Sequence, residues 1–277
     1  MGSAMDADAR YERLLQLLNS LGPAAVAFSG GVDSTLLLRA ALDALGARQV
    51  LAVTAVSVFF PAWEQQYSRD LAHQIGARQL LVPCDLLALP AVVRNDPLRC
   101  YHCKKALFGD CAEMARQTGF SLMLDGTNLD DGRDYRPGSR AARELGVRSP
   151  LAEAGLGKQD IRDLSRRLGL PTWKRPAFAC LASRIPYGSP ISAHALRQVD
   201  RCESALRSLG FDGSRARHHG ASVRIEIPLP LLSQILAEPT RRAVIRAAKE
   251  AGFTYVCLDL EGYRSGSLNE ILTEAEG

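Results

Sequence analysis

The stretch at residues 24–34, AAVAFSGGVDS, constrains the fold more than any other part of the chain. Its first five residues are small or apolar and predict a buried strand, which a serine and two glycines then end. Leucines and alanines recur on one side of a predicted helix at residues 35–45. A glycine turn between a strand and a helix presents backbone N–H groups and the positive end of the helix dipole. Such a turn is suited to binding a phosphate group.

The composition of this turn narrows the choice of ligand. It combines two hydroxyl groups, two glycines and a carboxylate: Ser29, Gly30, Gly31, Asp33 and Ser34. An ordinary tight connection is the alternative interpretation, because glycine pairs are common between strands and helices. The turn lacks the lysine of a Walker loop, which disfavours a nucleotide triphosphatase of that kind. The string SGGVDS resembles the pyrophosphate loop of the ATP-pyrophosphatase (PP-loop) superfamily, whose members adenylate a substrate. We therefore expect it to bind ATP.

The size and charge of the chain limit its class. Its 277 residues, 47% of them hydrophobic, suffice for one large domain or two unequal ones. Lysine and arginine (34) exceed aspartate and glutamate (30), and this net charge of +4 suits phosphorylated small molecules without requiring nucleic acid. The chain has no signal-like start and no apolar run of about 18 residues. We expect a cytoplasmic protein with no membrane contact.

Predicted strands and helices alternate along the first two thirds of the chain. A leading helix is expected at residues 11–21, strands at 50–58, 79–82 and 122–124, and helices at 61–75 and 106–118. Parallel strands joined by crossover helices are the economical arrangement for such an order. Ligands of these sheets bind at the carboxyl ends of the strands, so Val53 and Thr54 are expected to wall an adenosine pocket.

The pattern changes after Pro190. Helices are expected at residues 193–209 and 241–251, and strands at 223–227 and 254–258. We therefore predict an α/β protein with two parts. Residues 1–188 form a parallel-sheet PP-loop nucleotide-binding domain, and residues 189–277 form a smaller α+β domain for substrate binding or oligomerisation. We expect a homo-oligomer.

Residues 125–151 are rich in Gly, Asp and Arg and lack apolar periodicity, which predicts a long functional loop. Its candidate ligands for ATP or magnesium are Gly126, Thr127, Asn128, Asp130 and Asp131. For the two aspartates, a solvated turn with helix caps is an equal alternative. Lys158 begins a predicted helix, and its spacing resembles the second phosphate-contacting segment of the superfamily. An ordinary surface lysine is the alternative for this residue.

Seven cysteines, an odd number in a chain without a signal peptide, indicate reduced thiols, a metal site or catalysis. Cys100 and Cys103 form a C-x-x-C at a loop-to-helix junction, where the helix dipole, Arg99 and Lys104 are expected to lower their pKa values. Cys180 lies in a basic, irregular stretch, RPAFACLASRIPYG. Three cysteines with an open fourth position suit a [4Fe–4S] cluster that binds an exogenous ligand at its unique iron.

Other interpretations of the cysteines remain open. The C-x-x-C pair would also serve as a zinc staple completed by His102 or another residue, or as a redox dithiol. Cys180 alone would also be a packed thiol. The remaining cysteines fall in apolar patterns and are interpreted as small core or surface residues: Cys84, Cys111, Cys202 and Cys257.

The motifs taken together resemble one family over nearly the whole chain. They are SGGVDS, NDPLRCYHCK, GTNLDD, DYRPG, PL with the later Lys158, PAFACLASRIPYG, RARHHG and YVCLDLEGYRSGSLNE. This set is similar to the LarE family of ATP-dependent sulfur transferases (pyridinium-3,5-biscarboxylic acid mononucleotide sulfurtransferases). Those proteins help to build the nickel-pincer cofactor of lactate racemase. The resemblance implies ATP, Mg²⁺ and a pyridinium dicarboxylate mononucleotide as ligands.

The resemblance also assigns roles to residues. Cys180 falls on the sulfur-bearing cysteine of the family. Some members carry this cysteine alone and convert it to dehydroalanine, whereas others carry three cysteines and a cluster. This chain has the three-cysteine pattern, which implies a [4Fe–4S] cluster on Cys100, Cys103 and Cys180. Arg215 and Arg217 would hold the substrate phosphate as bidentate donors.

Some assignments in the second part of the chain stay open at this stage. Glu203 and Glu226 are interpreted as plain surface charges, with metal ligation as the alternative that the resemblance keeps. His218 and His219 are interpreted as polar loop residues. A tRNA thiolase of the same superfamily is the alternative function, although the strong basic patch it needs is not evident in the sequence.

Overall fold

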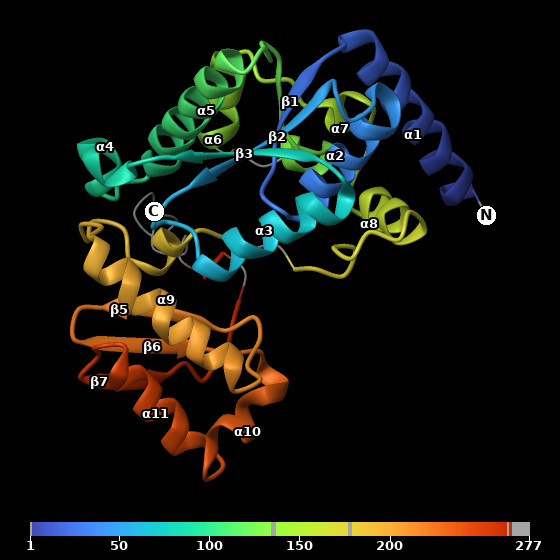
Figure 1. Cartoon of the computed structure of the whole chain (residues 1–277). Coiled ribbons are helices and arrows are strands. Elements are labelled where there is room, and N and C mark those ends of the chain that lie inside the picture. The colour runs from blue at the N-terminus through green and yellow to red at the C-terminus, as the bar shows by residue number, and fades with distance from the viewer. Residues whose placement is uncertain (1, 134–136, 177–178, 265, 268–277) are drawn as a thin grey trace. The chain divides into compact units, whose positions relative to one another are not determined.

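The computed structural model describes residues 2–133, 137–176, 179–264, 266 and 267. Contacts between residues divide the chain into two units (Figure 1). Unit 1 comprises Met1–Ser57, Ala62–Leu86 and Leu98–Phe178. Unit 2 comprises Val58–Pro61, Leu87–Pro97 and Ala179–Gly277. The predicted domain boundary after residue 188 stays a prediction.

A four-stranded parallel sheet organises unit 1. Its strands lie in the order β3 (Arg78–Pro83), β2 (Val50–Val56), β1 (Ala24–Ala27) and β4 (Met123–Leu124). Every neighbouring pair of these strands is parallel. Parallel neighbours need crossover connections, and helices supply them here. The predicted α/β fold with a parallel sheet is therefore confirmed.

Helices cover both faces of this sheet (Figure 1). One hydrophobic cluster joins Val26 to α1 (Gly2–Leu21), α2 (Val32–Leu45), α3 (Ala62–Ile75), α7 (Pro150–Glu153) and α8 (Lys158–Arg167). A second joins Ala25 to α5 (Arg99–Gln117) and α6 (Pro137–Glu144). Successive strand residues point to opposite faces, so a strand covered on both sides is apolar throughout. This burial explains why β1 and β2 are almost continuous apolar runs in the sequence, whereas β3 at the edge of the sheet begins with two polar residues.

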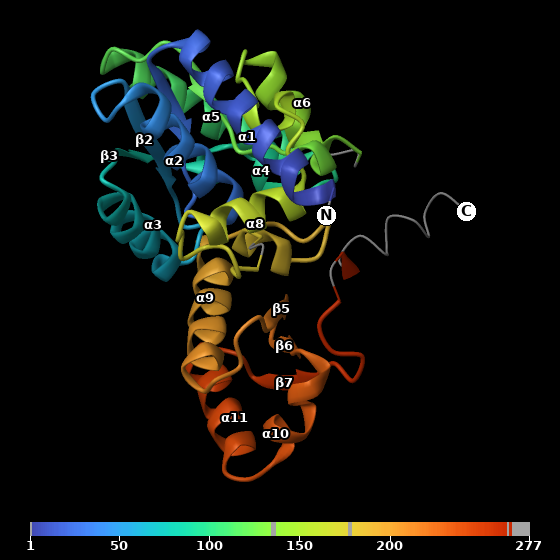
Figure 2. The same ribbon diagram turned by 90° about the vertical axis from the view of Figure 1, so that its right-hand side faces the viewer.

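Unit 2 contains a three-stranded sheet. β6 (Ser222–Glu226) lies between β5 (Arg215–His219), which is antiparallel to it, and β7 (Tyr255–Leu258), which is parallel to it. Figure 2 shows this sheet with its helices, α9 (Ala193–Ser208), α10 (Leu232–Leu236) and α11 (Thr240–Glu250). Val223 and Ile225 pack in the core of the unit with Val244 of α11. The Ser192 hydroxyl accepts a hydrogen bond from the Ala195 N–H at 3.1 Å and so caps the start of α9.

Short helical segments complete the described chain. They are η1 (Leu86–Ala88), α4 (Pro90–Val93), η2 (Leu129–Arg133), η3 (Leu181–Arg184) and η4 (Leu229–Leu231). None of the helices in the described ranges is both long enough and apolar enough to span a membrane.

The prediction of one long loop at residues 125–151 was wrong, because η2, α6 and the start of α7 lie within it. Helix α6 buries the small side chains of Ala141 and Ala142, which leave little apolar signal in the sequence. Residues 134–136 of the DYRPG motif lie outside the described residues. Helix α5 also begins earlier than the predicted residue 106, since its first two turns are polar.

Candidate functional site

The turn between β1 and α2 forms a loop whose small side chains bond to one another. The Ser29 and Ser34 hydroxyl oxygens lie 3.2 Å apart. The Ser34 hydroxyl donates to the Gly31 carbonyl at 3.2 Å, and the Gly31 N–H donates to the Ser29 hydroxyl at 3.3 Å. Gly31 is the N-cap of α2 and offers no side chain to the first N–H groups of the helix. An anion at this helix start would satisfy donors that the side chains leave open.

Close packing explains why glycine occupies two positions of this region. Gly30 has φ +73°, and a Cβ atom there would lie 3.3 Å from the Cα atom of Ser68 in α3. A Cβ atom on Gly126, just beyond β4, would lie 2.9 Å from the backbone nitrogen of Ser34. The predicted residue Gly126 therefore lies directly against the loop, and only glycine permits this approach.

Acidic residues gather beside the loop. The Asn128 amide donates to the Asp33 carboxylate at 3.2 Å, and the Lys158 ammonium lies 3.6 Å from the Asp131 carboxylate. Burial, together with the negative charge of Asp131, raises the pKa of the Asp33 carboxyl above its usual range. A divalent cation would stabilise both carboxylates, since oxygen ligands of this kind suit Mg²⁺.

The two neighbouring aspartates play different parts. The Asp130 carboxylate accepts the backbone N–H of Lys158 at 2.7 Å, where α8 begins. Negative charge at a helix start is stabilising, so Asp130 acts as a cap for α8. Asp131 instead faces the Lys158 side chain. The structure thus distinguishes two residues that the sequence left equal.

Thr54 lies near the end of β2, as predicted, but its hydroxyl is already committed. It donates to the Phe28 carbonyl at 2.6 Å and accepts from the Gln79 amide at 2.8 Å. The side chain therefore ties β1 to β2 and β3, and it is almost fully buried. A contact between Thr54 and adenosine stays a prediction.

Cys100 and Cys103 lie in the first two turns of α5. Residues three positions apart share one side of a helix, so the two thiols lie on the same side. Both are half-buried, and the Arg99 guanidinium donates to the Cys100 sulfur at 3.7 Å. The predicted junction between loop and helix is present, with α5 starting at Arg99.

Cys180 belongs to unit 2 and precedes η3. It is half-buried, and its carbonyl accepts hydrogen bonds from the Ser183 hydroxyl at 2.8 Å and from Arg184 at 3.1 Å. The three cysteines are thus divided between the two units. No group of three or more His, Cys, Asp or Glu side chains that would hold a metal occurs in the described part of the chain. A shared cluster stays a prediction.

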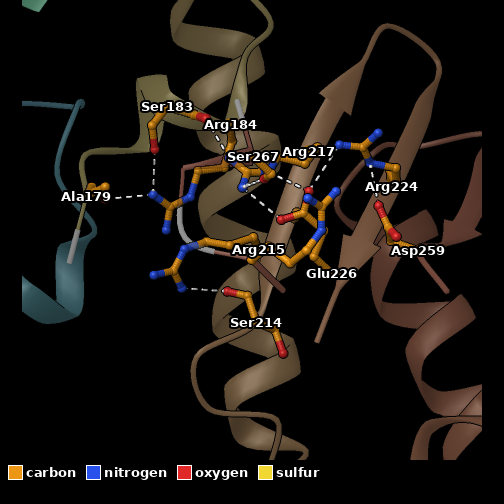
Figure 3. A network of polar contacts seen from close by, with 12 residues as sticks. Ala179, Ser183, Arg184, Ser214, Arg215, Arg217, Arg224, Glu226, Asp259 and Ser267 are labelled. Carbon is orange, nitrogen blue, oxygen red and sulfur yellow. Dashed lines mark hydrogen bonds and ion pairs between the residues drawn. The ribbon is translucent and has the colours of Figure 1, made fainter. Parts of the chain in front are cut away.

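A second candidate site lies in unit 2 and is built from long charged side chains (Figure 3). We call it the arginine network: Arg184, Glu203, Arg215, Arg217, Arg224, Glu226 and Asp259. Arg217 donates to both carboxylate oxygens of Glu226, at 2.9 and 2.7 Å. Arg184, which is fully buried, binds Glu203 in the same bidentate way, at 2.8 and 2.9 Å. Both pairs combine charge with fixed geometry.

Strand register explains how four of these residues come together. Arg215 pairs with Glu226 across β5 and β6, and Arg217 pairs with Arg224. Directly opposed residues in an antiparallel pair share one face of the sheet. Ala216, Val223 and Ile225 occupy the opposite face and pack in the hydrophobic core. The four charged strand residues of the network therefore lie on the face of the sheet that points away from this core.

The network carries more positive than negative groups. Arg215 donates to the carbonyls of Gly213 and Ser214, at 3.1 and 2.9 Å, and its guanidinium lies 4.7 Å from the centre of the Tyr263 ring. Burial, and then the charge of Arg184, lowers the pKa of Arg215 from its usual value. A bound anion would relieve this repulsion, which makes the network a candidate anion site.

Two sequence interpretations are corrected here, and one residue is added to the site. Glu203 and Glu226 are not plain surface charges, because Glu226 is buried, only 10% of the Glu203 side chain is exposed, and each carboxylate is paired with an arginine. His218 and His219 lie in β5 and not in a loop. Arg224 was missed altogether, although it alternates with Val223 and Ile225 on a strand that was predicted. This alternation in the sequence indicates that Arg224 lies on the face of β6 opposite to Val223 and Ile225.

Comparison with known proteins places the chain in a family. No protein-family model matches it. It is 42% identical over 267 residues to an uncharacterized protein of Synechocystis sp., covering 96% of this chain and 99% of that protein. It is 30% identical over 240 residues to an uncharacterized protein of Methanocaldococcus jannaschii, covering 87% and 90%. The pyridinium-3,5-bisthiocarboxylic acid mononucleotide synthase of Lactiplantibacillus plantarum is 40% identical over 263 residues, 95% of each chain. With such identity over nearly its full length, the chain belongs to the family of that synthase, the LarE family.

Proposed function

We propose that this protein is an ATP-dependent sulfur transferase of nickel-pincer cofactor biosynthesis. It adenylates a carboxylate of a pyridinium dicarboxylate mononucleotide and replaces one of its oxygens by sulfur. The observation that carries this proposal is the 40% identity, across 95% of the chain, to a synthase whose name states a bisthiocarboxylic acid mononucleotide as its product. The open helix start after Gly31 supports the use of ATP.

The loop between β1 and α2 (residues 29–34), which we call the phosphate loop, would bind ATP during the activation step. A carboxylate oxygen of the substrate attacks the α-phosphorus of ATP, and pyrophosphate leaves with its electron pair. N–H groups at the start of α2 would bind the negative charge that develops on this leaving group. Lys158 would add a positive charge beside Asp131. Asp33 and Asp131 would hold Mg²⁺, which supplies further neutralisation of phosphate charge when bound.

The second step replaces the adenylate by sulfur. A sulfur nucleophile attacks the activated carbonyl carbon, and AMP leaves with the original carboxylate oxygen. Cys100, Cys103 and Cys180 fit the donor set of a [4Fe–4S] cluster, since their thiols are partly exposed while Cys84, Cys111 and Cys202 are buried. Such a cluster supplies sulfide when bound. In the sacrificial alternative, the Cys180 thiolate itself attacks, and loss of its Cα proton then breaks the Cβ–S bond to leave dehydroalanine.

The arginine network would bind the phosphate of the mononucleotide. Arg215 and Arg217 are each 6% exposed, but the Arg217 guanidinium is paired with the Glu226 carboxylate, whereas that of Arg215 donates hydrogen bonds to the carbonyls of Gly213 and Ser214. We therefore assign the direct contact to Arg215 and the surrounding positive field to Arg217. Arg215→Ala should raise KM for the mononucleotide more than KM for ATP. Arg242→Ala, which removes an exposed charge from α11 of the same unit, is the matched control. Equal effects on both KM values would assign Arg215 a folding role.

The decisive experiment measures AMP and pyrophosphate formation with different acceptors. We expect turnover of ATP with the pyridinium dicarboxylate mononucleotide and none with tRNA. A gel-shift assay with tRNA tests the alternative function, a tRNA thiolase, because such an enzyme must bind tRNA. Turnover with tRNA alone, or none with the mononucleotide, would overturn the proposal.

Anaerobic purification followed by iron and sulfide analysis tests the cysteines. We expect about four irons per chain, lost on replacing Cys100, Cys103 or Cys180 by Ala but not on replacing the exposed Cys257. Adenylation should survive each replacement, because the phosphate loop contributes none of these thiols. Tightly bound zinc without iron would favour a zinc staple. Loss of one sulfur at Cys180, with Cys100→Ala and Cys103→Ala active, would establish the sacrificial route.

A further inference from the structure

Arg175 reaches the phosphate loop from a distant part of unit 1. Its Nη1 atom donates a hydrogen bond to the carbonyl of Gly30 at 2.8 Å. Its guanidinium also lies over two aromatic rings of α3, 3.9 Å from the centre of Tyr67 and 5.2 Å from that of Trp63. One side chain therefore joins the loop to the helix against which it packs. Cation–π contacts and a charged hydrogen bond both strengthen when they are shielded from water.

The Gly30 carbonyl that Arg175 binds belongs to the same peptide unit as the Gly31 N–H. The Gly30 carbonyl and the Gly31 N–H are opposite ends of one planar peptide unit. Fixing the direction of the carbonyl thus fixes the direction of the N–H, which lies at the N-cap of α2. A positive charge on the carbonyl also polarises the unit and strengthens its N–H as a donor.

This loop has a particular need for an external anchor. Two adjacent glycines give the backbone wide freedom, and ordering them costs more entropy than ordering other residues. Gly30 adopts φ +73° and approaches Ser68 closely, so a bulkier residue cannot supply stiffness at that position. An anchor from outside the loop supplies the stiffness without filling the space near the peptide.

The segment that carries Arg175 is itself held in place. Arg162 of α8 donates to the carbonyls of Trp173 and Arg175, at 2.7 and 3.1 Å. The Arg175 N–H donates to the Thr172 carbonyl at 2.8 Å. The guanidinium is therefore presented to the loop from a backbone that α8 fixes.

We propose that Arg175 is a positioning residue for nucleotide binding. It fixes the Gly30–Gly31 peptide, whose N–H donates to the Ser29 hydroxyl at 3.3 Å, and so holds the loop in the shape that binds the pyrophosphate portion of ATP. The proposal rests on the function proposed above for this loop. Arg175 acts through the backbone of the loop and supplies a cation that the lysine-free string SGGVDS lacks.

Binding of ATP and of inorganic pyrophosphate to the full-length protein tests this role. Arg175→Gln should weaken both affinities about tenfold, the loss expected for one charged hydrogen bond. Arg175→Lys keeps the charge without the planar fork and should recover part of the affinity. Lys174→Ala is the matched control, because Lys174 stands next in the same segment but lies over Trp173, 4.5 Å from its ring centre. It should bind ATP as the unchanged protein does.

Chemical rescue separates positioning from general folding. Guanidinium ion added to Arg175→Ala should restore pyrophosphate affinity, whereas a merely structural loss would not respond to it. KM for the mononucleotide should stay unchanged. Unchanged ATP affinity in Arg175→Gln, or an equal loss in Lys174→Ala, would overturn the inference while leaving the proposed function intact. Failure of the unchanged protein to bind ATP would overturn both.

Discussion

The phosphate loop of unit 1 and the arginine network of unit 2 are both candidate anion sites, but they are built in opposite ways. The loop relies on backbone N–H groups and on the hydroxyls of Ser29 and Ser34, whose oxygens lie 3.2 Å apart. The network relies on guanidinium groups that buried carboxylates hold, as Glu226 holds Arg217 at 2.7 and 2.9 Å. The loop uses mainly backbone N–H groups of one short segment, whereas the network uses long charged side chains from separate elements.

This difference determines what a substitution should do. Neutral hydrogen bonds within the loop are individually weak, so changes there should spare the fold and affect ligand binding. Buried charges in the network depend on one another, because an unpaired buried charge is costly. Changes there should affect the fold first. The comparison is therefore testable by measuring stability and activity on the same variants.

The largest expected effect follows from removing the central carboxylate of the network. Glu226 is 1% exposed and accepts hydrogen bonds from both Arg217 and Arg224. Glu226→Gln should destabilise unit 2 by about 3 to 5 kcal/mol, because the buried Arg217 guanidinium loses its counter-charge, whereas Arg224 keeps the Asp259 carboxylate at 3.3 Å. Denaturation followed by circular dichroism measures this loss.

The chain offers an internal reference for that measurement. Both of its tryptophans, Trp63 and Trp173, belong to unit 1, so their fluorescence reports on that unit alone. Circular dichroism should therefore change before fluorescence in Glu226→Gln. Glu261→Gln is the control, since Glu261 is 71% exposed in its pair with Arg264 and should lose less than about 1 kcal/mol. If Glu226→Gln lost no more free energy of unfolding than Glu261→Gln, the charges of the network would not depend on one another.

The loop was predictable because its features are consecutive. Ser29, Gly31 and Asp33 lie within five positions of each other, and a strand, a turn and a helix follow directly from their neighbours. The family resemblance pointed to the same stretch. Gly126 is far from this loop in the sequence. Its close approach to Ser34 explains why it is a glycine, but this approach follows only once β1 and β4 are known to be neighbours.

The network was not predictable in the same way. Glu226 alternates with Ile225, so strand periodicity correctly places it on the face away from the core and suggests a surface charge. The residues that cover that face, including Ser183, come from segments far away in sequence. Pairing between distant charges leaves no periodic signal, so the ion pairs of Glu203 and Glu226 and the burial of Glu226 could be found only from the structure.

The next largest effect is expected for Asp33, where a substitution should lower activity without lowering stability, the opposite of Glu226→Gln. Burial and Asp131 raise the pKa of Asp33, so the fold disfavours its charged form and a neutral isostere should not destabilise the protein. Asp33→Asn should nevertheless slow pyrophosphate release about 10²-fold, through loss of electrostatic stabilisation. Asp43→Asn, which changes an exposed aspartate of the same helix, is the control. Unchanged pyrophosphate release in Asp33→Asn would remove the residue from the site.

A smaller effect should come from filling the space beside the loop. The added Cβ of Gly126→Ala would lie 2.9 Å from the backbone nitrogen of Ser34, which belongs to a helix and cannot move freely. Overpacking of this kind costs about 1 to 3 kcal/mol and should also weaken ATP binding. Gly109→Ala in α5 meets nothing within 4 Å and should stabilise that helix by up to about 1 kcal/mol. Equal ATP affinities in the two variants would place Gly126 outside the site.

The smallest effect concerns pH and tests whether unit 2 is sensitive to charge outside the network too. Burial, and then the charges of His219 and His194, lower the pKa of His218 from its usual value of 6.5. Burial and Arg224 lower that of His219 in the same direction. The folded state therefore binds fewer protons than the unfolded state, and stability falls as the pH drops below about 6.5. The loss should stay below about 1 kcal/mol, because solvent screens both rings. Replacing both histidines by Asn should flatten the pH dependence of thermal unfolding of unit 2, and an unaltered dependence would assign it to other groups.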